Sequence, residues 1–256
     1  MAMFGMTKGN QMIQAVTSIH NTVVVGGVDS GKTFGYVVPN ILLETEKSMF
    51  VMDVYGELAN TYSYKENQGY QVFVYDLNHK DVLQILKKDL ATKKNKKRIM
   101  FVQARDGVTG QRVYELLEEL RKVLWREGLH IVLDGYEFCQ FSQITSMFSL
   151  WRSYHIGISI ILQSIFSIKN PLNRERIINN SHFLLCQGGH SKEESEWIYK
   201  HMKREGIING KEMVYEISSL EQNRALLVSH VEVVEKGSNY RFIDTLNSNE
   251  IYNMLS

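Results

Sequence analysis

The residues with the clearest chemical meaning lie in the stretch NTVVVGGVDSGKT, residues 21–33. Its spacing fits Gly-x-x-x-x-Gly-Lys-Thr, and the required positions hold Gly26, Gly31, Lys32 and Thr33. Backbone N–H groups of such a loop point at one phosphate, a lysine neutralises phosphate charge, and a threonine hydroxyl ligates Mg²⁺. The predicted phosphate-binding residues are Gly26, Gly27, Val28, Asp29, Ser30, Gly31, Lys32 and Thr33. The alternative is a chance match in a glycine turn.

Asp29 is unusual, because many such loops carry a small residue at this place. A carboxylate beside phosphates costs energy unless it points away or touches the metal shell. Translation-type GTPases tolerate aspartate here, so a GTPase is one alternative, and residues 53–56 fit D-x-x-G. The stretch NHKD at 78–81 has the letters of a guanine-reading N-K-x-D in the wrong order, which disfavours a GTPase.

The elements around this loop must position it. Residues 22–25 are β-branched and predict a buried strand, and residues 34–45 predict a helix that Pro39 must bend or interrupt. Along the chain, short apolar runs alternate with helical patterns. The further predicted strands are 48–53, 70–76, 98–103, 129–134, 157–163, 182–187 and 224–233, and the further helices are 56–67, 80–93, 109–126, 138–153 and 191–204. This alternation predicts an α/β fold with a mostly parallel sheet covered by helices on both faces.

Ligands of parallel sheets bind outside the carboxyl ends of the strands. Asp134 ends the apolar strand LHIVLD, so we expect it beside the glycine loop, where it holds Mg²⁺ together with Thr33. Gly135 follows, where hydrolysing ATPases of this build carry a water-polarising glutamate, and Glu137 comes two residues later. Glu137 is a candidate catalytic base, and its alternative role is a carboxylate that complements a helix start.

Two further residues are candidates for the reaction. Gln163 ends the strand GISIILQ, where its amide can hydrogen-bond a γ-phosphate or the attacking water, although a polar strand cap is the alternative. Arg152 ends a helix just before that strand. It can serve as an arginine finger for a neighbouring subunit's nucleotide, or it is simply a cation at a helix C-terminus.

The composition is that of an ordinary globular chain: 256 residues, 44% hydrophobic, 22% charged and a formal charge of +1. We expect one nucleotide-binding domain over 1–256, with a lead-in at about 1–20 and C-terminal strands and a helix over 205–256. Cys139 and Cys186 fit no metal or redox motif and predict buried free thiols in a reducing compartment. We find no predicted membrane span or signal peptide and expect a cytoplasmic protein.

The run KKDLATKKNKKR, residues 87–98, holds seven Lys or Arg residues and one Asp. A solvated helix end with its loop explains it, and a contact to a nucleic-acid phosphate backbone is the alternative.

With these segments placed, the chain resembles the nucleotide-binding domain of type IV secretion coupling proteins, the VirD4/TraG-like conjugation ATPases. Four stretches carry the resemblance in the family's order: the phosphate loop with the following Pro-Asn, the D-P-K-G-E-L segment, the L-D-E-F segment and the R-S-R-G-I-S-x-x-I-I-L-Q-S segment. The residues kept outside the loop are Asp53, Gly56, Glu57, Leu58, Asp134, Arg152, Ser153, Gln163 and Ser164. The resemblance spans roughly 20–190 and implies a RecA-like P-loop NTPase fold.

The chain also departs from the family pattern. Tyr55 replaces a lysine, Asp29 replaces a glycine and Gly135 replaces a glutamate. The family carries N-terminal membrane helices, and none is predicted here. Residues 78–128 read as one helix, a strand and another helix in place of the family's all-helical domain. We therefore expect a compact form whose ATP hydrolysis is slow.

The resemblance implies ATP and Mg²⁺ as ligands, a hexamer with nucleotide between subunits, and a motor that drives DNA or protein linked to DNA toward a secretion channel. The implied partners are DNA or a relaxase–DNA complex and the channel components, at the inner face of the membrane through a partner. The alternative is a nucleotide-binding adaptor or assembly subunit with little or no hydrolysis, and a GTPase is less favoured.

Overall fold

A computed structural model of the chain describes residues 3–6, 12–14, 19–54, 56–92, 96–104, 109–207, 213–221, 224–230 and 240–245. Tyr55 and, in the basic run, Lys93 and Lys94 thus lie outside the described residues. No helix among these residues is long and apolar enough to cross a membrane. The chain divides into two compact units: Met1–Asn40 with Leu162–Ser256, and Ile41–Ile161.

The first unit contains the phosphate loop. Its strands are β1 (Met3–Met6), β2 (Met12–Gln14), β3 (Asn21–Val25), β9 (Phe183–Gln187), β10 (Arg224–Ser229) and β11 (Tyr240–Asp244). They lie in the order β2-β1-β11-β10-β9-β3. β3 and β9 are parallel, with Val25 opposite Cys186, whereas the pairs beyond β9 are antiparallel. The carboxyl ends of β3 and β9 therefore meet where the phosphate loop begins.

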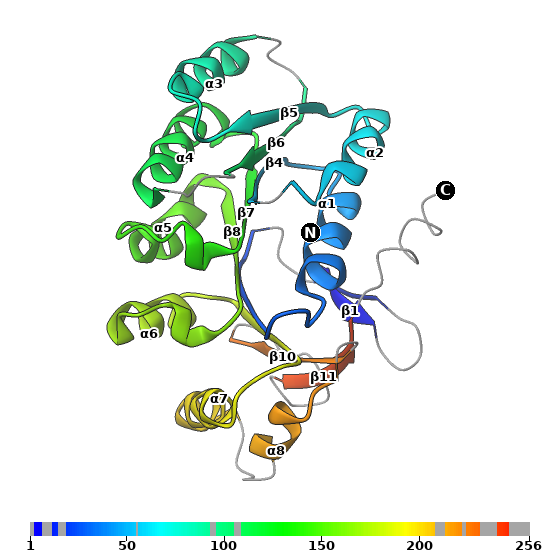
Figure 1. Cartoon of the computed structure of the whole chain (residues 1–256), viewed down its shortest axis with the longest axis vertical. Coiled ribbons are helices and arrows are strands. Elements are labelled where there is room, and N and C mark those ends of the chain that lie inside the picture. Colours follow the sequence, from blue (N-terminus) through cyan, green and yellow to red (C-terminus); the bar gives the residue numbers. More distant parts are fainter. Residues whose placement is uncertain are drawn as a thin grey trace. The chain divides into compact units, whose positions relative to one another are not determined.

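The second unit has parallel strands throughout. These are β4 (Ser48–Asp53), β5 (Gln71–Asp76), β6 (Arg98–Gln103), β7 (Leu129–Asp134) and β8 (Ile156–Leu162), in the order β8-β7-β4-β6-β5. β4, β7 and β8 are buried nearly throughout, because helices cover such a sheet on both faces. Figure 1 shows α3, α4 and α5 on one side of these strands and α2 on the other. The predicted α/β fold with a mostly parallel sheet is confirmed.

Helices connect the strands. The α-helices are α1 (Val38–Leu43), α2 (Tyr62–Asn67), α3 (Val82–Ala91), α4 (Gly110–Leu124), α5 (Ile144–Leu150), α6 (Pro171–Asn179), α7 (Lys192–Arg204) and α8 (Met213–Ser218). Between Asp76 and Leu129 the chain forms α3, β6 and α4, as the sequence predicted. Both cysteines are free and buried, also as predicted.

Pro39 shapes the helix that follows the phosphate loop. Residues Thr33–Val37 form a π-helix in which Val38 N donates to Thr33 O, five residues back, and α1 follows. Proline has no N–H and its ring clashes with the carbonyl four residues earlier, so a wider turn just before it relieves that clash. The next residue, Asn40, is buried and exchanges two hydrogen bonds of 2.8 Å with the backbone of Met3. This side chain therefore joins β1 to the helix of the loop.

The sequence did not predict β1, β2 or α6, and it gave no bounds for β11 and α8 within the C-terminal strands and helix expected over 205–256. The first two lie in the expected lead-in, and they are short and without a clear alternation. The predicted helix at 138–153 is shorter than expected, because 3-10 turns at Tyr136–Phe138 and Trp151–Tyr154 flank α5. In the basic run, Arg98 is 2% exposed and donates to Thr92 O, beyond the end of α3. This residue is structural rather than available to a nucleic acid.

Candidate nucleotide-binding site

The phosphate loop takes its shape from two residues with left-handed backbone. Asp29 has φ 56° and Gly31 has φ 86°. Among residues with a side chain, aspartate and asparagine adopt this conformation at the lowest cost, and glycine adopts it freely. Asp29 is also exposed at the tip of the loop. The backbone requirement explains why an aspartate is accepted at a place where other such loops carry glycine.

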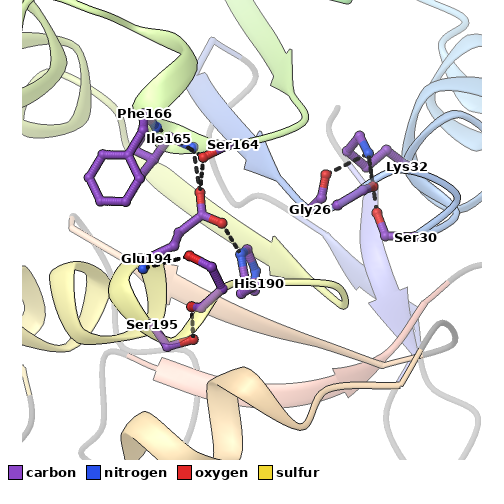
Figure 2. A network of polar contacts seen from close by, with 11 residues as sticks. Gly26, Ser30, Lys32, Ser164, Ile165, Phe166, His190, Glu194 and Ser195 are labelled. Carbon is purple, nitrogen blue, oxygen red and sulfur yellow. Dashed lines mark hydrogen bonds and ion pairs between the residues drawn. The ribbon is translucent and has the colours of Figure 1, made fainter.

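Lys32 lies inside this loop. Its Nζ donates to Gly26 O at 2.7 Å, to Gly27 O at 2.6 Å and to Ser30 Oγ at 3.2 Å (Figure 2). An ammonium has three donors and no acceptor, so these contacts hold it in the concave side of the turn. The charge is thus placed where a loop of this type binds phosphate.

The two glycines at the start of the loop have no room for a side chain. A Cβ on Gly26 would lie 2.5 Å from Ser30 Oγ, and one on Gly27 would lie 2.6 Å from Gly189 O. Gly26 N donates to Leu162 O at 3.2 Å, and Gly27 N donates to Gly188 O at 2.9 Å. The loop therefore rests on the last residue of β8 and on the loop that follows β9.

Thr33 begins the helix after the loop and is half-buried. The ammonium of Lys32, held inside the loop, fits a nucleotide phosphate by its charge. The described residues contain no group of three or more His, Cys, Asp or Glu side chains arranged for a metal. Mg²⁺ at nucleotide sites uses only one or two protein ligands besides phosphate oxygens and water, so a nucleotide site needs no such group.

Asp134 lies in the second unit, at the end of β7 and in register with Asp53 on β4. Asp53 is 4% exposed, and its oxygens accept hydrogen bonds from Glu57 N at 2.9 Å and Leu58 N at 3.2 Å. Burial raises the pKa of Asp53, although these backbone donors oppose the shift. Asp53 thus holds the turn that follows β4, and Asp134, half-buried, is the carboxylate of the pair that remains a metal-ligand candidate.

Gly135 follows Asp134 with φ 72° and ψ 41°. The turn after β7 needs this left-handed residue, and a Cβ there would lie 3.0 Å from Phe138 Cδ2. The left-handed backbone at position 135 therefore accounts for a glycine where the family carries glutamate. Glu137 is half-buried in the 3-10 turn Tyr136–Phe138, which begins directly after Gly135. This position is compatible with both roles considered for Glu137.

Gln163 and Arg152 are both exposed. Gln163 is the first residue after β8 and adjoins Leu162, whose carbonyl accepts from Gly26 N. Gln163 therefore directly follows a residue that is hydrogen-bonded to the phosphate loop. Arg152 lies in the 3-10 turn Trp151–Tyr154 that ends α5, in the second unit. Its exposure suits contact with another molecule as well as a cation at a helix end.

The sequence analysis missed polar residues next to the phosphate loop. Glu194 and His190 form a buried pair, with His190 Nδ1 3.0 Å from Glu194 Oε2. Gln187 ends β9 beside Gly26 and is fully buried, and within the described residues its amide atoms have no hydrogen-bond partner. The stretch Ser191–Glu194 reads as a capping box, S-x-x-E, and that pattern assigns Glu194 to helix capping. Only the fold shows where its carboxylate points.

Comparison with known proteins supports this fold. The sequence matches the family model described as Type IV secretory system Conjugative DNA transfer over residues 4–84. A search of curated proteins by sequence found no match. Among solved structures, VirB4 of Thermoanaerobacter pseudethanolicus is similar with a TM-score of 0.64 and 9% identity, covering 98% of this chain and 98% of that one.

Two further structures hold nucleotides. Plasmid coupling protein TrwB in complex with ADP and Mg²⁺ has a TM-score of 0.62 and 9% identity, covering 96% of this chain and 94% of that chain. The genome packaging NTPase B204 from Sulfolobus turreted icosahedral virus 2, in complex with AMPPCP, has a TM-score of 0.60 and 14% identity and covers 90% of this chain and 100% of that chain. The chain therefore has the RecA-like P-loop fold of these proteins, and its match over residues 4–84 confirms the resemblance to the coupling proteins of conjugation.

Proposed function

We propose that the chain binds ATP with Mg²⁺ and acts as a compact ATPase of the type IV secretion and conjugation coupling type. The observation that carries the proposal is the loop of residues 26–33, in which the Lys32 ammonium lies within a turn made by Asp29 and Gly31. This arrangement presents a positive charge and backbone donors to one phosphate. The complexes of TrwB with ADP and Mg²⁺ and with an ATP analogue support it.

Further residues have proposed roles at this site. Thr33 and Asp134 hold the Mg²⁺, which when bound neutralises charge on the β- and γ-phosphates. Gln163 hydrogen-bonds the γ-phosphate or the water, and its place directly after Leu162 supports this role. Glu137 is the candidate base, and Arg152 is the candidate arginine finger of a neighbouring copy. We also propose that the two units form one nucleotide-binding domain over 1–256.

The proposed work of this site is to drive DNA, or a relaxase–DNA complex, toward a type IV secretion channel. The family match over residues 4–84 and the fold shared with TrwB and VirB4 support this proposal. The proposed partners are therefore DNA, the channel components and further copies of this chain, up to a hexamer. We place the protein in the cytoplasm, at the inner face of the membrane through a partner.

A nucleotide-binding adaptor with little hydrolysis is the second candidate. Gly135 favours it, because the turn after Asp134 uses left-handed backbone where a glutamate would be strained. An adaptor would bind ATP through the same phosphate loop and change its assembly state without rapid turnover.

Phosphate release from Mg²⁺–ATP, with and without single-stranded DNA, distinguishes the two. Turnover that DNA stimulates and that Lys32→Ala abolishes supports the ATPase. ATP binding without turnover under either condition supports the adaptor. A clear preference for GTP in competition binding would contradict both candidates and favour a GTPase. Competition between ATP and GTP is therefore measured together with phosphate release. TrwB was solved with a GTP analogue as well as with an ATP analogue, which makes this competition informative.

A further inference from the structure

Glu194 is a buried carboxylate on the first turn of α7, and it is only 2% exposed. Its Oε1 accepts hydrogen bonds from Ser164 Oγ at 2.9 Å and from Ile165 N at 2.5 Å. Its Oε2 pairs with His190 Nδ1 at 3.0 Å. A carboxylate out of water is costly unless it is hydrogen-bonded, so these three contacts account for its burial.

The first two contacts hold the segment that follows β8. Ser164 and Ile165 come directly after Gln163, the residue proposed to contact the γ-phosphate. Arg174 on α6 holds the same segment through its carbonyls, donating to Ile165 O at 3.1 Å and Ile168 O at 2.9 Å. Glu194 thus accepts hydrogen bonds from two donors of this segment, and Arg174 donates to two of its carbonyls.

The third contact leads back to the phosphate loop. His190 follows Gly188 and Gly189, and Gly188 O accepts the hydrogen bond from Gly27 N. A Cβ on Gly189 would lie 3.0 Å from Gly27 Cα, so the two backbones are in direct contact. Figure 2 shows Glu194 between Ser164 and His190, and it shows Lys32 with Gly26 and Ser30 as a separate group of contacts.

We propose that Glu194 is a positioning residue for the phosphate site. It joins the segment that carries Gln163 to the loop after β9, whose Gly188 supports Gly27. Glu194 therefore fixes the position of Gln163 relative to the phosphate loop. All of these residues belong to the first unit. The proposal rests on the proposed function, because it assigns Glu194 to the recognition of the γ-phosphate through Gln163.

Loss of Glu194 should affect the contacts to the γ-phosphate and not those to the β-phosphate. The phosphate loop itself is shaped by Asp29, Gly31 and Lys32, and none of these contacts involves Glu194. The β-phosphate contacts should therefore survive the loss of Glu194, whereas the placement of Gln163 should not. ADP has no γ-phosphate, so the ratio of ATP to ADP affinity reports the proposed role separately from folding.

The experiment measures the binding of Mg²⁺–ADP and of a non-hydrolysable Mg²⁺–ATP analogue by calorimetry, in the full chain. Glu194→Ala should keep ADP affinity within about twofold and lose about ten- to a hundredfold in analogue affinity, because hydrogen bonds to a charged group are lost. Glu194→Gln, which keeps one acceptor, should lie between Glu194→Ala and the wild type. Glu193→Ala and Glu193→Gln are matched controls, since Glu193 is exposed on the same turn, and both should bind like the wild type.

The outcomes are distinct. Equal losses for ADP and the analogue would mean that Glu194 only supports α7, and unchanged affinities would mean that it positions nothing; either result overturns the proposal. If the wild type binds neither nucleotide, the proposed function fails and this inference fails with it. If Glu194→Ala does not fold, Glu194→Gln carries the test. Hydrogen exchange at the Ile165 amide, which should speed up in Glu194→Gln but not in Glu193→Gln, checks the contact itself.

Discussion

Asp53 and Asp134 are paired in register at the carboxyl ends of β4 and β7, yet they differ in their surroundings. Asp53 is buried and accepts two backbone N–H groups, whereas Asp134 is half-buried at the strand end. Two adjacent carboxylates with the same sequence context, an aspartate at the end of an apolar strand, thus differ in role: Asp53 holds a turn, and Asp134 is the proposed metal ligand.

The first prediction contrasts these two residues. Asp53→Asn should lower the free energy of unfolding by about 1–3 kcal/mol, because an amide nitrogen cannot accept the second backbone N–H. Asp134→Asn, at the proposed metal ligand, should weaken the Mg²⁺ dependence of nucleotide binding. Urea unfolding and Mg²⁺ titrations in the presence of nucleotide measure both. Unchanged Mg²⁺ affinity in Asp134→Asn would remove this residue from the site.

The second prediction concerns Gly135. Gly135→Glu should lower the free energy of unfolding by about 1–2 kcal/mol, because a residue with a Cβ is strained at φ 72°. Its ATP turnover should nevertheless rise, since a glutamate there can polarise water. Gly135→Asn, which tolerates left-handed backbone, is the control and should keep stability without a gain in turnover. Fast wild-type turnover that Glu137→Gln abolishes would instead make Glu137 the base.

The third prediction is a pH dependence. Burial lowers the pKa of His130 to about 4, against the charge of Glu44, and its Nε2 lies 2.9 Å from Ser159 Oγ. Below the unfolded pKa of about 6.5 the unfolded chain binds the proton more readily than the folded one. Stability should therefore be fully present above pH 6.5 and be lost as the pH falls toward 4.

Unfolding at pH 7.5 and pH 5 measures this effect. His130→Gln keeps a partner for Ser159 and should lose less stability on acidification than the wild type. His201 is also buried with a pKa lowered to about 4, so part of the loss should remain in that variant. His79→Gln changes an exposed histidine and should behave like the wild type. An identical acid loss in His130→Gln would contradict the assignment.

The fourth prediction concerns assembly. We expect a monomer or weak oligomer alone, and rings only with nucleotide, DNA or a partner. Arg152→Ala should leave ATP binding by the single chain unchanged and lower turnover of the assembled form by about a thousandfold. Light scattering with and without ATP and single-stranded DNA gives the size. Unchanged assembled turnover would make Arg152 a helix-end cation, and a stable hexamer without nucleotide would contradict the expected weak assembly.

Much of this fold could be predicted from the sequence, because the parallel strands are continuous apolar runs with sharp ends. β4, β6 and β7 begin and end where the pattern placed them. β1 could not be predicted, because its pairing depends on β11, more than two hundred residues further along the sequence, and on Asn40. β2 pairs with β1. Short strands of this kind carry too little local pattern.

The phosphate loop was also predictable, because the spacing of its glycines and lysine is typical of a loop that binds phosphate. Glu194 was not, because S-x-x-E already has a local explanation in helix capping. Its carboxylate bonds to Ser164, thirty residues away, and only the fold brings the two together. The same holds for Gly135, whose replacement of glutamate suggests a lost base until its left-handed backbone is seen.

The central claim is that residues 26–33 bind the phosphates of ATP, and the fifth prediction tests it. Affinity for Mg²⁺–ATP should fall by about tenfold or more in Lys32→Ala, because a charge-assisted contact to phosphate is worth about 1.5–3 kcal/mol. The control Lys169→Ala removes an exposed lysine of the same unit and should bind like the wild type. The deciding measurement is calorimetric titration of the wild type, Lys32→Ala and Lys169→Ala with Mg²⁺–ATP: loss in Lys32→Ala alone is the predicted result, and equal ATP affinity in all three would contradict the account.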